Sequence, residues 1–208
     1  MTGSIQKHGS LPDPNDNTGR DRVVFLHGRG ANERSGLMFI DVFPDSVLLL
    51  PRGGVREGPG FAWFRNVGIG IADEASLTEE VTTLEAWIDA AVPSGSRVWL
   101  SGISNGAAMA GALLSSRPQR YAGAMFISGP FVHRRPWPPG RFQGLPIQFV
   151  YGDQDPVIPQ HLMQDSVKYL TDESGAEVTV SPYMGGHFPT LSAVTDVTAW
   201  FKARSKAA

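Results

Sequence analysis

A serine between two glycines, Ser104 in the run Gly102–Gly106, has the spacing Gly-x-Ser-x-Gly. The apolar run 97–100 precedes it and the small-residue run 107–114 follows it, which predicts a strand, a sharp turn and a buried helix. Such a turn lifts the serine hydroxyl out of a sheet, and the two glycines let strand and helix approach closely. The spacing alone recurs by chance, but in this setting it indicates a serine nucleophile.

A serine hydroxyl needs a base to take its proton, most often a histidine that a carboxylate orients. Of five histidines, His187 follows a late predicted strand in a glycine turn, after Ser104 and the candidate acids. The alternative for His187 is a surface histidine in a loop. The other four are His8 in the polar N-terminus, His27 in the turn after the first strand, His133 in a proline-rich loop before every candidate acid, and His161 inside a predicted helix.

Two carboxylates, Asp153 and Asp155, follow the fifth predicted strand, and only one can orient His187. Asp153 begins the turn, where a carboxylate accepts N–H groups two residues on, so we expect a local structural role. Asp155 precedes Pro156, which favours an extended backbone. Its side chain can reach toward the His187 loop, and the sequence therefore favours Asp155 as the acid.

Acyl transfer also needs two backbone N–H groups that face the developing oxyanion. We expect one from Asn105, directly after the nucleophile, and one from Arg29, in the turn His27–Gly30 after the first strand. The alternative is an ordinary glycine turn. It is not a nucleotide-binding loop, because Gly-x-Gly-x-x-Gly would require glycine at Glu33.

Short apolar strands alternate with helices along the chain, which predicts a mostly parallel sheet with helices on both faces. The expected strands are 22–26, 46–50, 97–100, 123–127, 146–151 and 177–181, and the expected helices are 35–43, 107–117, 159–170, 189–202 and one that a capping box at Ser76 begins. Ser104, Asp155 and His187 each follow a predicted strand. They should therefore meet at the carboxyl edge of the sheet.

Residues 53–72 read as one long loop with six glycines. We expect Phe61, Trp63 and Phe64 in it to wall an acyl groove, or otherwise only to fill the core beneath the loop. The proline-rich segment 128–145 is too short for a helical cap domain, so we expect an open site.

The composition bounds the remaining possibilities. The chain has 208 residues, which suits one domain, and its net charge of −2 does not indicate a nucleic-acid partner. It has no cysteine, which excludes a thiol nucleophile and thiolate metal sites. Residues 1–20 form a polar lead without the apolar core of a secretory signal, and no apolar stretch is long enough for a membrane span. We therefore expect a cytoplasmic protein.

Five blocks of the chain together resemble the phospholipase/carboxylesterase family, small serine α/β-hydrolases that include acyl-protein thioesterases. The blocks are Leu26–Gly30, Trp63–Phe64, Gly102–Ala110, Tyr151–Pro159 and Gly185–Pro189, in the family's order. The resemblance implies Ser104 as nucleophile, Asp155 as acid, His187 as base, and the N–H groups of Arg29 and Asn105 as oxyanion donors. It implies no metal or cofactor. Because family members often dimerise, the resemblance also suggests a homodimer.

The sequence departs from the family pattern without losing a catalytic group. Asn105 stands where Gln is common, Ala107 where Gly is common, and Tyr151 where His is common. Arg29 stands where Leu is common, which changes the rim of the pocket and weakens any inference about the substrate.

We therefore expect a single-domain α/β-hydrolase over residues 21–208, with about six or seven strands and no cap domain. The expected activity is a serine carboxylesterase that hydrolyses short- to medium-chain esters of small molecules through an acyl-enzyme. The alternatives are a thioesterase acting on acyl-proteins or acyl-CoA and an acyltransferase. A ligand receptor on this scaffold would typically lack a triad member, and all three are present.

Overall fold

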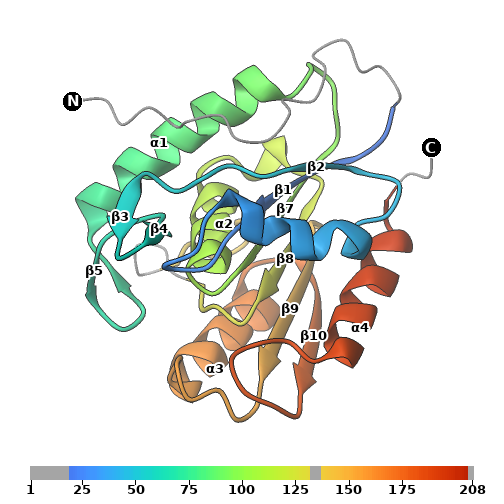
Figure 1. Ribbon diagram of the computed structural model, residues 1–208. Helices are drawn as coiled ribbons and strands as arrows, with labels where there is room; N and C mark the ends of the chain where they lie inside the picture. Colours follow the sequence, from blue (N-terminus) through green and yellow to red (C-terminus); the bar gives the residue numbers. More distant parts are fainter. Residues whose placement is uncertain (1–18, 132–136, 206–208) are drawn as a thin grey trace.

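A parallel sheet forms the centre of the molecule (Figure 1). The computed structural model describes residues 19–131 and 137–205, and within these ranges the sheet has six strands in the order β10-β9-β8-β7-β1-β2. The strands are β1 (Arg22–Leu26), β2 (Val47–Leu49), β7 (Val98–Ile103), β8 (Gly123–Ile127), β9 (Pro146–Gly152) and β10 (Glu177–Tyr183). All neighbouring strands pair in parallel, which confirms the predicted sheet.

Helices cover both faces of this sheet, as the sequence predicts. They are η1 (Glu33–Val42) and η2 (Pro118–Arg120), which are 3-10 helices, α1 (Glu74–Ala91), α2 (Asn105–Ser116), α3 (Gln160–Lys168) with its π-helical continuation η3 (Tyr169–Glu173), and α4 (Leu191–Lys202). Because side chains alternate along a strand, Val24 and Leu100 join the core under α1, α2 and α3. Phe25 and Trp99 face the opposite core, with η1 and α4.

Helix α1 begins earlier than the sequence predicts. Its N-cap is Asp73, whose carboxylate accepts the N–H of Ser76 at 2.7 Å. The predicted capping box at Ser76 is therefore wrong. Ser76 lies in the first turn, and its hydroxyl accepts the N–H of Arg65 at 3.0 Å, which ties the preceding segment to the helix.

The glycine-rich segment 53–72 contains two antiparallel hairpins rather than one long loop. Strand β3 (Val55–Glu57) pairs with β4 (Gly60–Ala62), and β5 (Asn66–Gly68) pairs with β6 (Ile71–Ala72). With two or three residues each, these strands are too short for a readable alternation of apolar and polar side chains, so the sequence did not predict them.

The segment between β8 and β9, residues 128–145, is the one that the sequence predicts to be too short for a cap domain. Residues 132–136 of it lie outside the described residues, as do most of the polar lead at 1–20 and the histidines His8 and His133. The described remainder of the segment consists of turns and irregular backbone. Of the helices that the structure describes, none is long and apolar enough to cross a membrane.

Candidate active site

Ser104 lies in the turn between β7 and α2, where the sequence predicts a nucleophile. Its backbone has φ +57° and ψ −118°, a conformation that costs a non-glycine residue on the order of 1–3 kcal/mol. The N–H of Ser104 donates to the carbonyl of Ile127 at the end of β8, at 2.9 Å. This bond anchors the strained residue to the neighbouring strand.

Three glycines make room for this turn. A Cβ on Gly106 would collide with the carbonyl of Leu26 in β1, and a Cβ on Gly102 would meet the backbone of Gly106. A Cβ on Gly129 would collide with the carbonyl of Ser104 itself. The backbone of α2 can therefore press against β1 and β7 only because these positions lack side chains.

His187 and Asp155 are directly bonded. The Nδ1 atom of His187 lies 2.8 Å from Oδ2 of Asp155, whose side chain is fully buried. The other carboxylate oxygen, Oδ1, accepts the N–H groups of Val157 and Ile158 at 2.7 and 3.0 Å. The carboxylate is thus fixed by its own turn and presents its second oxygen to the imidazole.

Asp153 does not have the local role that the sequence gives it. Its Oδ1 accepts the N–H of Gly185 at 3.1 Å, across the sheet edge in the loop that carries His187. It is Asp155 that accepts N–H groups of the residues that follow it, two and three positions on. Both carboxylates therefore hold the His187 loop, one through its backbone and the other through the imidazole.

The two amides expected to form the oxyanion hole line the same cavity as Ser104 and His187. Within the described part of the chain, the N–H groups of Arg29 and Asn105 have no acceptor, so both are available to a bound oxygen. The Arg29 side chain is occupied elsewhere, because its guanidinium donates to Glu57 at 2.7 Å and to the carbonyl of Phe64 at 3.2 Å.

His27 stabilises the turn that carries Arg29, as the sequence suggests. Burial lowers the pKa of His27 below its ordinary value of 6.5, so the ring is neutral at pH 7. Its Nε2 accepts the N–H of Gly53 at 3.1 Å, which places the ring proton on Nδ1, 2.8 Å from the carbonyl of Gly28. The His27 carbonyl accepts the indole N–H of Trp63 at 2.8 Å.

Only one of the three aromatic side chains expected to wall the groove does so. Phe64 lines the cavity, but Phe61 and Trp63 do not. Trp63 is buried against His27, and its backbone N–H donates to the side chain of Asn105 at 2.8 Å. Phe61 packs beneath the guanidinium of Arg52, 4.5 Å from the ring centroid. Trp63 therefore fills the core beneath this segment, which was the alternative for these aromatics.

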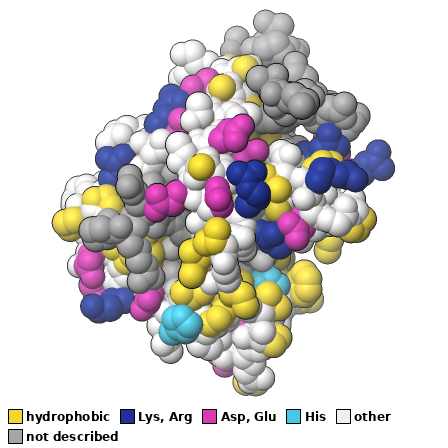
Figure 2. All heavy atoms as spheres, turned by 90° about the vertical axis from the view of Figure 1, so that its left-hand side faces the viewer, with side chains coloured by type: hydrophobic (Ala, Val, Ile, Leu, Met, Phe, Trp, Pro, Cys, Tyr) yellow, Lys and Arg dark blue, Asp and Glu magenta, His cyan; other side chains and the backbone are white. Residues whose placement is uncertain are grey.

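The cavity around Ser104 holds about 820 Å³, within the size range of small-molecule sites. Its mouth is apolar, because four lining side chains are also strongly exposed: Met38 (82%), Ile69 (63%), Val157 (50%) and Phe188 (78%). Figure 2 shows apolar side chains gathered beside histidine on one face of the molecule.

The sequence did not predict these four residues as part of the site. Met38 lies in the unbroken apolar run 37–40, of which only Phe39 is buried, and this run was the available signal.

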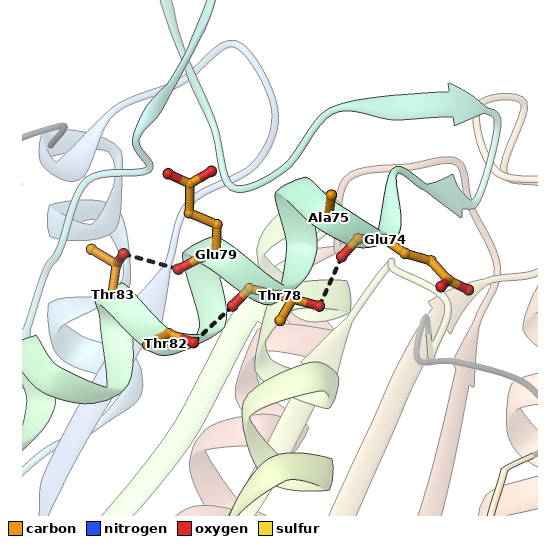
Figure 3. Close-up of a pocket in the computed structure, with 6 residues that line it drawn as sticks. All are labelled: Glu74, Ala75, Thr78, Glu79, Thr82 and Thr83. Carbon is orange, nitrogen blue, oxygen red and sulfur yellow. Dashed lines mark hydrogen bonds between the residues drawn. The ribbon is translucent and has the colours of Figure 1, made fainter. Parts of the chain in front are cut away.

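A second hollow, of about 580 Å³, lies along the outer face of α1 (Figure 3). The hydroxyls of Thr78 and Thr82 there donate back to the carbonyls of Glu74 and Thr78, at 2.8 and 3.0 Å. The hollow contains none of the candidate catalytic residues. Over residues 19–131 and 137–205, no three His, Asp or Glu side chains gather as metal ligands.

Comparisons with known proteins agree with this geometry. The sequence model of the family described as Phospholipase/Carboxylesterase matches residues 13–203. Acyl-protein thioesterase 1 of Schizosaccharomyces pombe is 26% identical over 181 residues, covering 78% of this chain and 81% of that protein. A carboxylesterase structure from Bacillus cereus has a TM-score of 0.81 at 26% identity, covering 90% of both chains. One from Mesorhizobium loti, with a TM-score of 0.77 at 21% identity over 88% of both chains, shows the shared fold alone.

Proposed function

Because the chain belongs to the phospholipase/carboxylesterase family of serine hydrolases, we propose that it is a carboxylesterase that works through an acyl-enzyme on Ser104. The observation that carries this proposal is the bonded pair His187–Asp155 in the cavity that also contains Ser104. We propose short- to medium-chain esters of small molecules as its substrates.

In the first step, the Oγ of Ser104 attacks the ester carbonyl while Nε2 of His187 takes the hydroxyl proton. The N–H groups of Arg29 and Asn105 donate to the oxygen that becomes negative, and Asp155 stabilises the imidazolium. The tetrahedral intermediate then expels the alcohol, which takes its proton from His187. The acyl group remains on Ser104.

In the second step, His187 takes a proton from water, and the resulting hydroxide attacks the acyl-enzyme. The same two N–H groups stabilise the second oxyanion. When the intermediate collapses, the carboxylic acid leaves and Ser104 recovers its proton from His187. In one cycle His187 accepts two protons and gives up two, which returns the enzyme to its starting state.

The cavity favours uncharged, apolar substrates. Its lining comes from elements on both faces of the sheet, for example Phe39 and Val194 on one face and Ile158 on the other. The single Lys or Arg in the lining is Arg29, and its guanidinium is already bonded to Glu57. A substrate with several phosphates, such as acyl-CoA, therefore finds no unpaired cation in the described lining.

A thioesterase acting on acylated proteins is the second candidate. The curated relative named above is an acyl-protein thioesterase, and an open apolar mouth accepts an acyl chain presented from a protein surface. The proposed triad would attack a thioester carbonyl in the same way. Cytoplasmic location and a homodimer remain predictions from the sequence.

The test of the proposed function is Ser104→Ala, with Ser116→Ala as its control. Ser116 is an exposed serine at the end of the same helix, α2. We expect wild type and Ser116→Ala to take up one fluorophosphonate per chain and to release a burst of p-nitrophenol from p-nitrophenyl butyrate. Ser104→Ala should do neither and should retain only residual hydrolysis. Labelling of another serine, or an unchanged burst in Ser104→Ala, would reject the nucleophile.

A further inference from the structure

The hydroxyl of Tyr183 lies behind the loop that carries His187. Tyr183 ends β10, its ring is buried against the α4 side of the sheet, and it does not line the cavity around Ser104. Its hydroxyl lies 2.9 Å from the carbonyl of Gly186, the residue directly before His187. Since a carbonyl can only accept, Tyr183 donates its proton to Gly186.

Ser128 supplies the second partner of that hydroxyl. Its Oγ lies 3.0 Å from the Tyr183 oxygen. Because the tyrosine proton already goes to Gly186, Ser128 must be the donor in this bond. Ser128 is itself held firmly: its N–H donates to Val150 at 2.8 Å, and its φ of +49° is a conformation that non-glycine residues rarely adopt.

The tyrosine remains a donor over the working range of an esterase. Burial raises the pKa of Tyr183 above its ordinary value of 10, so the hydroxyl keeps its proton at neutral and mildly alkaline pH. The bond to Gly186 is therefore a constant feature of the folded protein rather than one that titrates.

Each residue of the tripeptide Gly185–His187 is bonded to a different group. Gly185 is held by the carboxylate of Asp153 at 3.1 Å and by the N–H of Gln154 at 3.0 Å. His187 is held through its imidazole by Asp155. Gly186 is held by Tyr183, and its carbonyl belongs to the peptide unit whose nitrogen is that of His187. Rotation of this peptide would move the imidazole.

We propose that the hydroxyl pair Ser128–Tyr183 positions the base His187, so that Tyr183 is a positioning residue for the reaction. The inference rests on the proposed function, because it assigns to His187 the proton transfers described above. The pair connects the end of β8, which also anchors Ser104 through Ile127, to the His187 loop. The proposed nucleophile and the proposed base are in this way both anchored to the end of β8.

The test is Tyr183→Phe, which keeps the buried ring and removes only the hydroxyl. We expect kcat to fall between about 10-fold and about 100-fold, as a displaced catalytic group would cause. The KM should stay within about twofold, because Tyr183 does not line the cavity. The rate of fluorophosphonate labelling at Ser104 should fall in parallel with kcat.

The matched control is Tyr169→Phe. Tyr169 is also buried, and its hydroxyl also donates to a backbone carbonyl, that of Pro138 at 2.9 Å. This variant loses the same kind of bond away from His187, so we expect a comparable drop in Tm with unchanged kcat and labelling rate. If both variants lose Tm alike and both keep kcat, Tyr183 is merely structural and the proposal is wrong.

Ser128→Ala gives an independent test, including the case in which Tyr183→Phe does not fold. It removes the donor to Tyr183 and leaves the Gly186 bond, so we expect a smaller loss of kcat at constant KM. In the Tyr183→Phe background, Ser128→Ala should have no further effect on kcat. A folded Ser128→Ala with wild-type kcat overturns the proposal. An inactive, unlabelled wild type would instead reject the proposed function.

Discussion

Asp155 combines two functions in one carboxylate. Oδ1 is bonded to two N–H groups of the following turn, and Oδ2 to the imidazole of His187. A carboxylate held in this way cannot rotate away from the histidine. In the proposed mechanism it therefore keeps the ring proton on Nδ1 and leaves Nε2 free for the proposed role as base toward Ser104.

We predict that Asp155→Asn and Asp153→Asn separate chemistry from loop support. In Asp155→Asn the amide oxygen can still accept the turn N–H groups, but the amide nitrogen facing Nδ1 favours the wrong tautomer. Turnover should fall by about 10⁴ with little change in Tm, by analogy with the same change in serine proteases. In Asp153→Asn the acceptor for Gly185 remains, so turnover should stay within a few-fold of wild type.

Steady-state kinetics and thermal unfolding of both variants decide the assignment. An inactive Asp153→Asn beside a nearly normal Asp155→Asn would reverse the roles of the two carboxylates. Loss of folding in Asp155→Asn would instead show that the fold needs the negative charge of this carboxylate.

Ser104 and Asp155 could be found in the sequence because each follows a strand that reads clearly as apolar, and His187 because it lies in a glycine turn after a late predicted strand. Phe61 and Trp63 could not be placed, because an aromatic residue in a short irregular segment has no periodicity to tell its inner from its outer side. Nor could Tyr183, whose importance depends on a bond to Gly186 that only the folded loop creates.

Helix α2 is an element that the sequence specifies almost completely. All of its residues except Ser116 are buried, and the small side chains let it lie between the sheet and α1. Gly106 is the closest point of approach, against the carbonyls of Leu26 and His27. The position of the Ser104 turn therefore depends on the absence of a side chain at Gly106, as it does at Gly102 and Gly129.

We predict that Gly106→Ala destabilises the fold by about 1–3 kcal/mol or more, because its Cβ would meet rigid backbone. For a chain of this length that corresponds to a drop in Tm of about 2–4 °C for each kcal/mol. Thermal unfolding and turnover measure the two consequences, and turnover should fall too, since the displaced helix carries Asn105.

The control for that variant is Gly68→Ala in the β5–β6 hairpin. An added Cβ there meets only the flexible side chain of Ile71, at 3.4 Å. We expect a Tm within about 2 °C of wild type, a shift of half a kcal/mol or so. A Gly106→Ala protein as stable as Gly68→Ala would contradict the close packing of the turn.

Most of the elements that the sequence predicted correctly are long or buried, although the three-residue strand β2 is neither, and those it missed are short. Strands β7, β8 and β9 are apolar runs with no competing interpretation. The start of α1 was misplaced because Asp73 and Ser76 are both good N-caps, and the local pattern does not contain the bond that Ser76 makes to Arg65. The β3–β4 hairpin depends on backbone bonds between Phe61 and the distant residues Gly30 and Ala31, which no local pattern contains.

The whole molecule is built around one six-stranded sheet, and its candidate site lies at the carboxyl edge of that sheet. The exposed side chains of Met38, Ile69 and Phe188 border the cavity, and no helix in the described residues lies across it. We therefore expect a substrate in solution to reach Ser104 directly. Catalysis by this architecture should not require an oil–water interface.

We predict a characteristic response to a series of p-nitrophenyl esters from acetate to palmitate. The value of kcat/KM should rise while added methylenes fill the cavity of about 820 Å³ and fall for longer chains. Rates should follow the concentration of dissolved ester smoothly. A sharp increase when the ester passes its solubility limit would show that the site is closed until an interface opens it. Matched thioesters measured in parallel decide between the two candidate functions.

The order of strands in the sheet also has a consequence for the synthesis of the protein. β1, made early, lies between β2 and β7, so it lacks one neighbour until the chain has grown past residue 103. The loop with His187 follows β10, the edge strand that pairs only with β9. A growing chain on the ribosome therefore exposes Ser104 before the proposed base, and we expect the proposed hydrolase to stay inactive until β10 and the His187 loop have emerged and folded.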